Sequence, residues 1–394
     1  MTSLHDGGRG LTRRTVLGAC AGLAMPSLAR AAGAARVAVV HPVTGPFSAA
    51  GALARAGARL GWRMAGADAG AVDLVEVDLG PDPEAVPAVV EALAGEGVSA
   101  LVGGLTSPHA LAVAVGARSS GLPFMVDLAG SDAFLGSGFP RVFRFAPGFD
   151  RMLLQAVVSL AAINTEAGDP SKSVLIVREP RGFAGTVALR VADRFDQAGF
   201  ELLPMVDYRS AAGAGEVAET VRNQAPDVLV PLAARELLAP LLAAVAREGV
   251  PLKAIVTLLA LSDMEENFSD LPGFELVIDL NHGFNTRSDD GKRFLEAVSA
   301  AGLPLRPEVF VAANAMRCLC DGMRRARSAD PGEIAAAIAR SSFAEAAMPY
   351  EATAFRDGEN LGAHGALMQI QNGRPALVSP QRFQASEIVY PRPV

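Results

Sequence analysis

The sequence has no cluster of basic residues and no long apolar run. Of its 394 residues, 35 are Lys or Arg and 42 are Asp or Glu, so the formal net charge is -7. Proteins that bind nucleic acid usually present a face rich in Lys and Arg. This sequence offers no such face, so we expect no nucleic-acid partner. The apolar segment close to the N-terminus is too short to cross a bilayer as a helix.

Catalytic and cofactor motifs are also missing. No GxSxG nucleophile motif occurs, no GxGxxG opens the first predicted helix, and "VGGLTSPH" lacks the lysine and the length of a phosphate-binding loop. The histidines do not have the spacing of a metal site such as HExxH; they are His5, His41, His109, His282 and His364. We therefore expect a protein that binds a molecule without transforming it, with no metal and no cofactor. A secreted α/β enzyme is the alternative, and turnover of a bound ligand would identify it.

Cysteine is scarce. Of the three cysteines, Cys20 lies near the N-terminus, whereas Cys318 and Cys320 stand two apart in a predicted helix. Side chains two apart on a helix point about 200° from each other, which disfavours a disulfide between them. We expect one buried and one surface thiol, with no metal.

The N-terminal segment has the order of an export signal. "LTRRTVLGACAGLAMPSLARAAGA" begins with Arg13 and Arg14, continues with a short apolar stretch and ends in small residues. This pattern predicts a signal peptide over residues 1–31, cleaved after Ala31, and the twin arginines favour the Tat route to the periplasm. A lipoprotein signal cleaved before Cys20 is disfavoured, because the preceding apolar stretch is shorter than the usual ~7–15 residues.

Strands and helices alternate in the remainder, which is long enough for two domains. The first series predicts strands over 35–41, 72–80, 98–104 and 122–128, with helices over 51–66, 82–95 and 107–121. A second series begins at residue 173 and includes a strand over 201–208. Helices follow over 289–302, 308–325 and 330–340, and Asn372-Gly373 predicts the turn of a β-hairpin. This rhythm indicates an α/β protein whose parallel sheets are covered by helices.

Several motifs occur in an order that resembles a known family. The motifs are "HPVTGPFSAAG", "DLGPDPEAVPAVVEALAGEGVSALVGGLTS", "GLPFMV", "VFRFAP", "SVLIVREPRGFAG", "PEVFVAANAM" and "MQIQNGR". Together they resemble the periplasmic solute-binding proteins of the branched-chain amino acid type, which serve ABC importers and have the two-lobed type I fold. The resemblance spans essentially the whole chain after the signal.

The resemblance implies two lobes joined by three crossings, with a small-molecule ligand between the lobes. We place lobe 1 at 35–147 plus 283–350 and lobe 2 at 148–282 plus 351–394. The crossings are expected near Pro147, near 281–284 and near 350–355. The implied partner is a membrane ABC permease, and the protein is expected to be a monomer. A periplasmic sensor of the same fold, acting on a receptor or regulator, is an alternative.

The end of the strand at Gly103-Gly104 is the first candidate binding position. Ligands of open α/β sheets bind beyond the carboxyl ends of the strands, and free amides at a helix start favour a carboxylate. By resemblance, Ser107 donates its hydroxyl and amide to the ligand's carboxylate, helped by backbone amides around Pro108 and His109. Alternatively, Ser107 only caps the helix, and both roles are compatible.

Further contacts are expected from the resemblance or from residues on predicted loops of lobe 2. The Ala129 carbonyl and the Ser131 hydroxyl are expected to complete recognition of the head group, although the alignment also allows Gly130 there. Phe47 and Phe183 are expected to line the apolar part of the ligand. Arg181, with Arg235, either pairs with an acidic ligand or is solvated; both lie on predicted loops of lobe 2.

One position departs from the family pattern. Amino acid binders carry an acidic residue after the strand that matches "LKAIVTLL", and this chain has Ala260 there. An ammonium group buried without a counter-charge costs several kcal/mol, on the order of the desolvation penalty of an ion. We therefore expect a carboxylate-bearing or largely apolar solute rather than a standard amino acid. Asp263 or Glu265 would restore amino acid binding if the loop shifted.

Overall fold

The structure, a computed structural model, describes residues 35–66, 72–261, 263–344 and 347–393. The predicted signal peptide, its cleavage site and Cys20 lie outside the described residues. All described residues belong to one compact unit. None of the helices in these ranges is both long enough and apolar enough to cross a membrane.

The first sheet contains seven of the described strands, and all neighbouring strands except β12 and β13 run parallel. Its strands in spatial order are β12 (Phe355–Arg356), β13 (Glu359–Asn360), β5 (Val142–Arg144), β4 (Phe124–Val126), β3 (Ala100–Gly103), β1 (Ala35–His41) and β2 (Val72–Asp78). Alternate residues of β1 point to opposite faces, as expected of a strand that is covered on both sides. Val39 packs in the core on the side of α1 and α9, whereas Val40 packs on the side of α2 and α3.

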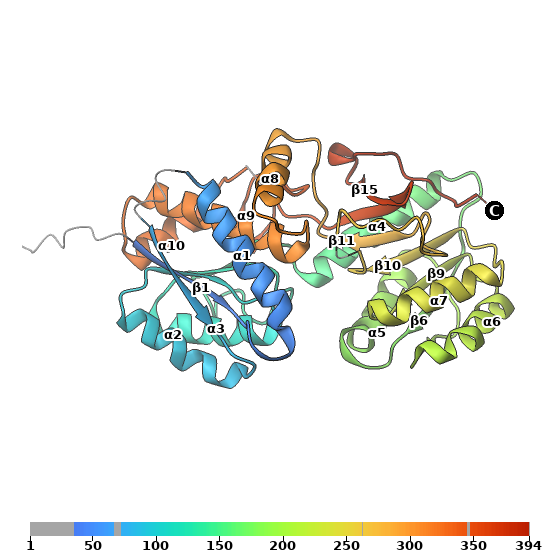
Figure 1. The fold of residues 1–394 in the computed structure, drawn as a ribbon, viewed down its shortest axis with the longest axis horizontal. Coiled ribbons are helices and arrows are strands. Elements are labelled where there is room, and N and C mark those ends of the chain that lie inside the picture. The colour runs from blue at the N-terminus through green and yellow to red at the C-terminus, as the bar shows by residue number, and fades with distance from the viewer. Residues whose placement is uncertain (1–34, 67–71, 262, 345–346, 394) are drawn as a thin grey trace, which may run out of the picture. The chain divides into compact units, whose positions relative to one another are not determined.

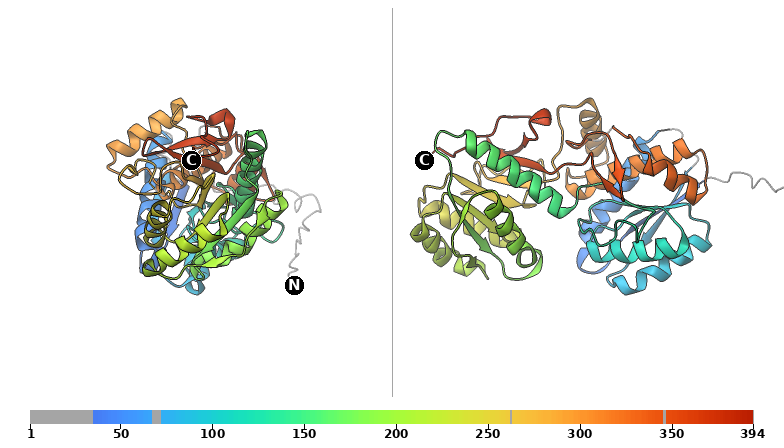
Figure 2. Two further views of the ribbon diagram at one scale, coloured as in Figure 1. Left: turned by 90° about the vertical axis from the view of Figure 1, so that its right-hand side faces the viewer. Right: turned by 180° about the vertical axis from the view of Figure 1, so that it is seen from behind.

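Helices cover both faces of this sheet (Figures 1 and 2). One face carries α2 (Val86–Gly95) and α3 (Ser107–Ser120), and the other carries α1 (Ser48–Met64) and α9 (Pro307–Ala326). Against α9 packs α10 (Pro331–Ala339), and α8 (Asp289–Ala300) is joined to α9 by an ion pair. The short 3-10 turns η1 (Gly45–Phe47) and η3 (Pro83–Ala85) precede α1 and α2. The side chain of Asp82 caps η3 by accepting the Glu84 amide at 2.9 Å.

The second sheet contains eight of the described strands, parallel except for the pairs that β14 makes. Its strands in spatial order are β15 (Arg374–Ser379), β14 (Ala366–Gln371), β11 (Ile278–Asn281), β10 (Ala254–Leu258), β9 (Val228–Leu232), β6 (Ser173–Arg178) and β7 (Glu201–Leu202), with β8 (Val206–Asp207) also paired to β6. Ile176 of β6 packs with α4 (Phe149–Glu166) and α5 (Gly182–Gln197), whereas Leu175 packs with α6 (Ala214–Gln224) and α7 (Arg235–Arg247). The 3-10 turns η4 (Ala211–Gly213) and η5 (Gln381–Phe383) complete the elements.

Two details of the second sheet test the sequence reading. The hairpin turn at Asn372-Gly373 is confirmed: both residues have positive φ, 53° and 73°, between antiparallel β14 and β15. The single strand predicted over 201–208 is wrong, because the structure has two short strands there, β7 and β8. Pro204 lies between them and has no N–H to donate to a neighbouring strand.

The chain passes between the two sheets at 145–148, at 282–288 and at 361–365. The sequence predicts crossings near Pro147, near 281–284 and near 350–355. Residues 355–360, which we assigned to lobe 2, form β12 and β13 at the edge of the first sheet, so the third passage comes after them. The other lobe boundaries stay a prediction.

The two cysteines of α9 are both buried and free. The expectation of a surface thiol is therefore wrong. Helix α9 is enclosed on nearly all sides, so even positions two apart face other elements.

Candidate ligand-binding site

The strand end at Gly103-Gly104 has the geometry that requires glycine. The two residues have φ of 136° and 101°, which side chains rarely adopt. A Cβ atom on Gly103 would lie 2.2 Å from the Val40 carbonyl oxygen. The bare backbone therefore lets β3 end against β1 and turn directly into α3.

The first turn of α3 leaves Ser107 available. Thr106, not Ser107, is the N-cap, and its hydroxyl accepts the N–H of His109 at 3.4 Å. Among the described residues, no hydrogen-bond partner is recorded for the Ser107 hydroxyl. Pro108 is exposed and has no N–H, so it cannot donate to a ligand. Of the three predicted contacts on this turn, Ser107 is the one whose polar groups are free to bind.

His109 holds the turn in place rather than reaching outward. It is buried, its Nδ1 lies 2.7 Å from the Thr106 hydroxyl, and its Nε2 lies 3.1 Å from the Gly80 carbonyl oxygen. Because that carbonyl accepts, Nε2 carries the proton and Nδ1 accepts from Thr106. Phe47 meets the His109 ring edge-on at 6.2 Å and is 44% exposed. The Phe47 ring, packed against His109, thus remains partly exposed next to the first turn of α3.

A buried carboxylate joins this turn to the loop after β4. Asp127 accepts hydrogen bonds from the Leu105 and Leu128 backbone amides at 3.1 and 2.7 Å and from His41 Nε2 at 2.6 Å. Burial opposes its ionisation, but the charge and hydrogen bond of His41 and the two amides hold the Asp127 pKa below its usual value. Asp127 therefore ties the backbone at Leu105, just before α3, to the loop that follows β4.

The loop 128–131 contains the other predicted head-group contacts. Ala129 is buried, and no hydrogen bond from a described residue to its carbonyl oxygen is recorded. The Ser131 hydroxyl accepts the Ala133 amide at 3.2 Å and keeps its own proton to donate. The Gly130 carbonyl accepts the Phe149 amide at 2.9 Å, so Gly130 is engaged with α4. The Ser131 hydroxyl can therefore donate to a ligand, whereas the Gly130 carbonyl is already engaged.

Phe183 packs against Phe149, the residue whose amide is bound to the Gly130 carbonyl of this loop. The two rings meet edge-on at 5.4 Å, and Phe183 is 54% exposed at the start of α5. Arg181, the residue before α5, is exposed, and no contact with another predicted site residue is recorded among the described residues. The structure thus connects Phe47 with the α3 turn and Phe183 with the 128–131 loop, and leaves Arg181 apart.

The second sheet has its own buried carboxylate, which the sequence analysis missed. Asp279 of β11 accepts the Ala260 and Leu261 amides at 3.0 and 3.1 Å, the Thr257 hydroxyl at 2.7 Å and the Asn281 side-chain amide at 2.8 Å. Burial without a cation raises its pKa above the usual value. An aspartate in the middle of "ELVIDLNHG" was the available signal, because a buried carboxylate requires several donors.

The Ala260 amide is bound to Asp279, and its side chain is a methyl group. The loop after β10 therefore presents no charge at that position. Asp263 accepts the Glu265 amide at 2.9 Å within its own loop. Glu266 is paired with Arg235, whose guanidinium also lies 5.0 Å from the Phe268 ring centre. Arg235 is therefore engaged within the protein and not free for an acid.

Metal chemistry has no candidate in the described part of the chain, where no group of three or more His, Cys, Asp or Glu could hold an ion. The arrangement offers hydroxyls, amides and aromatic edges. Such groups suit the binding of a polar head and an apolar body.

Several solved structures that resemble this chain are substrate-binding proteins of transporters. A substrate-binding protein of an ABC transporter from Desulfitobacterium hafniense, in complex with Leu, superposes with a TM-score of 0.68 at 16% identity, covering 87% of this chain and 99% of that chain. A solute-binding protein from R. palustris with benzoate gives 0.69 at 17% identity over 91% and 98% of the chains. One from Rhodopseudomonas palustris BisB5 with 3,4-dihydroxybenzoic acid gives 0.68 at 14% over 91% and 98%.

These likenesses confirm the two-lobed type I fold. No curated protein sequence matches the chain. The sequence model of one family, described as periplasmic binding protein, matches residues 34–375. The chain belongs to the periplasmic binding protein family.

Proposed function

We propose that this protein is exported to the periplasm, captures a small carboxylate-bearing organic molecule and delivers it to an ABC importer. An aromatic acid of the benzoate type is the ligand class that we favour. The family and the fold neighbours are binding proteins, which supports binding without catalysis. Export would use the twin-arginine signal and end with cleavage after Ala31.

The observation that carries this proposal is the state of Ser107. Its hydroxyl has no partner among the described residues, and it stands at the start of a fourteen-residue helix whose cap is already supplied by Thr106. A carboxylate placed there would gain a charge-assisted hydrogen bond and the positive end of the helix dipole. The half-exposed ring of Phe47 beside this turn suits an aromatic body.

The ligand class follows from what surrounds Ala260. An α-amino acid needs a carboxylate or several acceptors for its ammonium group. In the loop after β10, the Ala260 position offers a methyl group, Asp263 binds its own loop, and Glu266 is paired with Arg235. The fold neighbours with benzoate and with 3,4-dihydroxybenzoic acid support an acid without an amine.

Thermal unfolding with and without ligand tests the proposal. The probes are benzoate, 3,4-dihydroxybenzoate, L-leucine and L-isoleucine, and a true ligand at a hundred times its dissociation constant stabilises the fold by ~2.7 kcal/mol. We expect the aromatic acids to stabilise the protein and to be recovered unchanged after denaturation. The strongest response with leucine would refute the ligand class, and recovery of a converted product would indicate an enzyme.

Ser107→Ala and Thr106→Ala form a matched pair for the contact itself. Ser107→Ala should remove most of the stabilisation by benzoate while leaving the melting temperature of the ligand-free protein unchanged. Thr106→Ala removes the cap and should lower the free energy of unfolding by about 1 kcal/mol. Equal benzoate affinity in wild type and Ser107→Ala would exclude Ser107 as an anchor.

Export has its own test. Replacing Arg13 and Arg14 by lysines should leave the protein in the cytoplasm, because the Tat route depends on the paired arginines. Fractionation and N-terminal sequencing of the exported wild type should find a chain that begins at Ala32. A chain that begins at Cys20 and carries lipid would contradict the predicted cleavage site.

A further inference from the structure

Arg144 connects the loop of the candidate site to the strands at which the chain passes between the sheets. It is the last residue of β5, and its side chain is 2% exposed. It donates to the Ser131 carbonyl oxygen at 2.7 Å, to the Asp132 carboxylate at 2.6 Å and to the Glu359 carboxylate. A buried charge is costly unless it is paired and hydrogen-bonded. These three acceptors therefore fix the guanidinium in one position.

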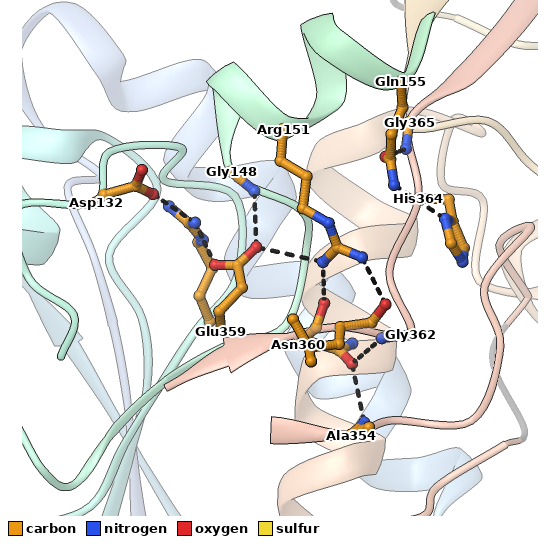
Figure 3. Close-up of polar contacts among 12 residues, drawn as sticks. Asp132, Gly148, Arg151, Gln155, Ala354, Glu359, Asn360, Gly362, His364 and Gly365 are labelled. Atoms are coloured by element: carbon orange, nitrogen blue, oxygen red, sulfur yellow. Dashed lines mark hydrogen bonds and ion pairs between the residues drawn. The ribbon is translucent and has the colours of Figure 1, made fainter. Parts of the chain in front are cut away.

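Glu359 forms an ion pair with Arg144 and connects the first passage of the chain with the start of the third (Figure 3). Its carboxylate also accepts the Gly148 amide at 3.4 Å and pairs with Arg151 at 3.5 Å. Arg151, on the first turn of α4, donates in addition to the carbonyl oxygens of Asn360 and Leu361, at 2.6 and 2.5 Å. The first passage and the start of the third are thus held together around one carboxylate.

A buried amide strengthens the same junction. The Asn360 side chain donates to the Phe145 carbonyl oxygen at 2.9 Å and accepts the amides of Ala354 and Gly362, at 3.2 and 3.1 Å. Phe145 belongs to the first passage, and Gly362 belongs to the third. Backbone on both sides is therefore fixed by side chains of β13.

Arg144 occupies the space that a side chain at Gly148 would need. A Cβ atom at Gly148 would lie 2.2 Å from the Arg144 Nη2 atom, so the guanidinium rests against bare backbone of the first passage. The next residue, Phe149, donates its amide to the Gly130 carbonyl oxygen. The 128–131 loop is consequently attached to the first passage at two points, Ser131 through Arg144 and Gly130 through Phe149.

We propose that Arg144 and Glu359 are positioning residues that couple ligand binding at the 128–131 loop to the relative movement of the two lobes. This inference rests on the proposed function. A ligand that binds the Ser131 hydroxyl shifts the Ser131 carbonyl, which Arg144 binds. Arg144 passes this shift to Glu359, which contacts Gly148 of the first passage and Arg151, the residue that binds the start of the third. Neither side chain is among the predicted ligand contacts.

The test compares Glu359→Gln with Glu351→Gln in the full chain carrying Cys20→Ser. Glu351 also pairs with an arginine, Arg382 at 2.9 Å, but both side chains are more than half exposed and make no recorded contact with the site loop. Spin labels at Ala88→Cys and Asn223→Cys, on exposed positions of α2 and α6, report the distance between the lobes. The buried thiols of α9 stay unlabelled.

We expect Glu359→Gln to weaken benzoate binding about tenfold, within the 5- to 150-fold range typical of coupling between sites. Its ligand-free distance distribution should be broader than that of wild type, and saturating benzoate should restore the wild-type distance. Glu351→Gln should match wild type in both measurements. Arg144→Lys, which keeps the charge but loses the fork of donors, should resemble Glu359→Gln.

Two results overturn the inference. One is a folded Glu359→Gln with the benzoate affinity and distance distribution of wild type, and the other is an equal change in Glu351→Gln. If wild type responds to no probe, the proposed ligand class fails first. The ligand-free distances still decide the coupling in that case, because an unchanged distribution in Glu359→Gln overturns it.

Discussion

His282, at the second passage between the sheets, should make the stability of the protein depend on pH between about 6.5 and 4. The side chain is buried, and among the described residues its Nδ1 atom has no hydrogen-bond partner. Burial lowers the His282 pKa from 6.5 to about 4. Because the unfolded chain binds this proton more readily than the folded one, the stability contributed by the neutral ring is lost as pH falls through this window.

The magnitude follows from the size of the shift. One pKa unit corresponds to 1.36 kcal/mol, so a shift from 6.5 to about 4 amounts to about 3 kcal/mol when the whole window is crossed. Urea unfolding of wild type and His282→Gln at pH 7.0 and at about pH 4.5 measures it. Wild type should lose about 2–3 kcal/mol more than the variant between the two values. Parallel losses in both proteins would refute the assignment.

Three further predictions concern backbone, thiols and carboxylates. Gly103→Ala should lower the free energy of unfolding by more than ~2 kcal/mol, because the added Cβ would lie 2.2 Å from the Val40 carbonyl oxygen. Gly97 has open space around its Cβ position, so Gly97→Ala should cost about 1 kcal/mol in the same denaturation assay. The two thiols of α9, whose pKa burial raises to about 12, should react with a disulfide reagent only after unfolding; fast labelling of the native protein would contradict this. As pH rises, the difference in unfolding free energy between wild type and Asp127→Asn should increase, whereas the difference between wild type and Asp279→Asn should decrease. If both differences changed with pH in the same direction, the assigned pKa directions would be contradicted.

Local patterns predicted the elements of this fold well. β-branched runs indicated the parallel strands, and the Asn-Gly pair indicated the turn between β14 and β15. The edge strands β12 and β13 were missed, although Asp357-Gly358 carries the same kind of turn signal, with φ of 49° and 83°. Each of these two strands has only two residues, too few for alternation of polar and apolar side chains to be visible.

The candidate site was less accessible to sequence reasoning. Ser107 could be proposed from its place after a strand and Phe47 from the family resemblance. The roles of Thr106 and His109 depend instead on which side chain completes a hydrogen bond. Arg144 gave no signal, because one of its acceptors, Glu359, lies 215 residues further along the chain. Long-range pairs of this kind are set by topology and leave no periodicity in the sequence.

Asp127 and Asp279 are buried aspartates in similar sequence settings, yet their pKa values are shifted in opposite directions. Each follows buried strand residues, in "MVDL" and "VIDL", and each accepts two backbone amides from loops at the carboxyl edge of its sheet. The amides alone do not offset burial, as the raised pKa of Asp279 indicates. Asp127 has in addition the imidazole of His41, 86 residues away, and its pKa is lowered. The difference between the two carboxylates therefore comes from one side chain that β1 delivers to the first sheet, while Thr257 and Asn281, the side-chain donors to Asp279, are neutral.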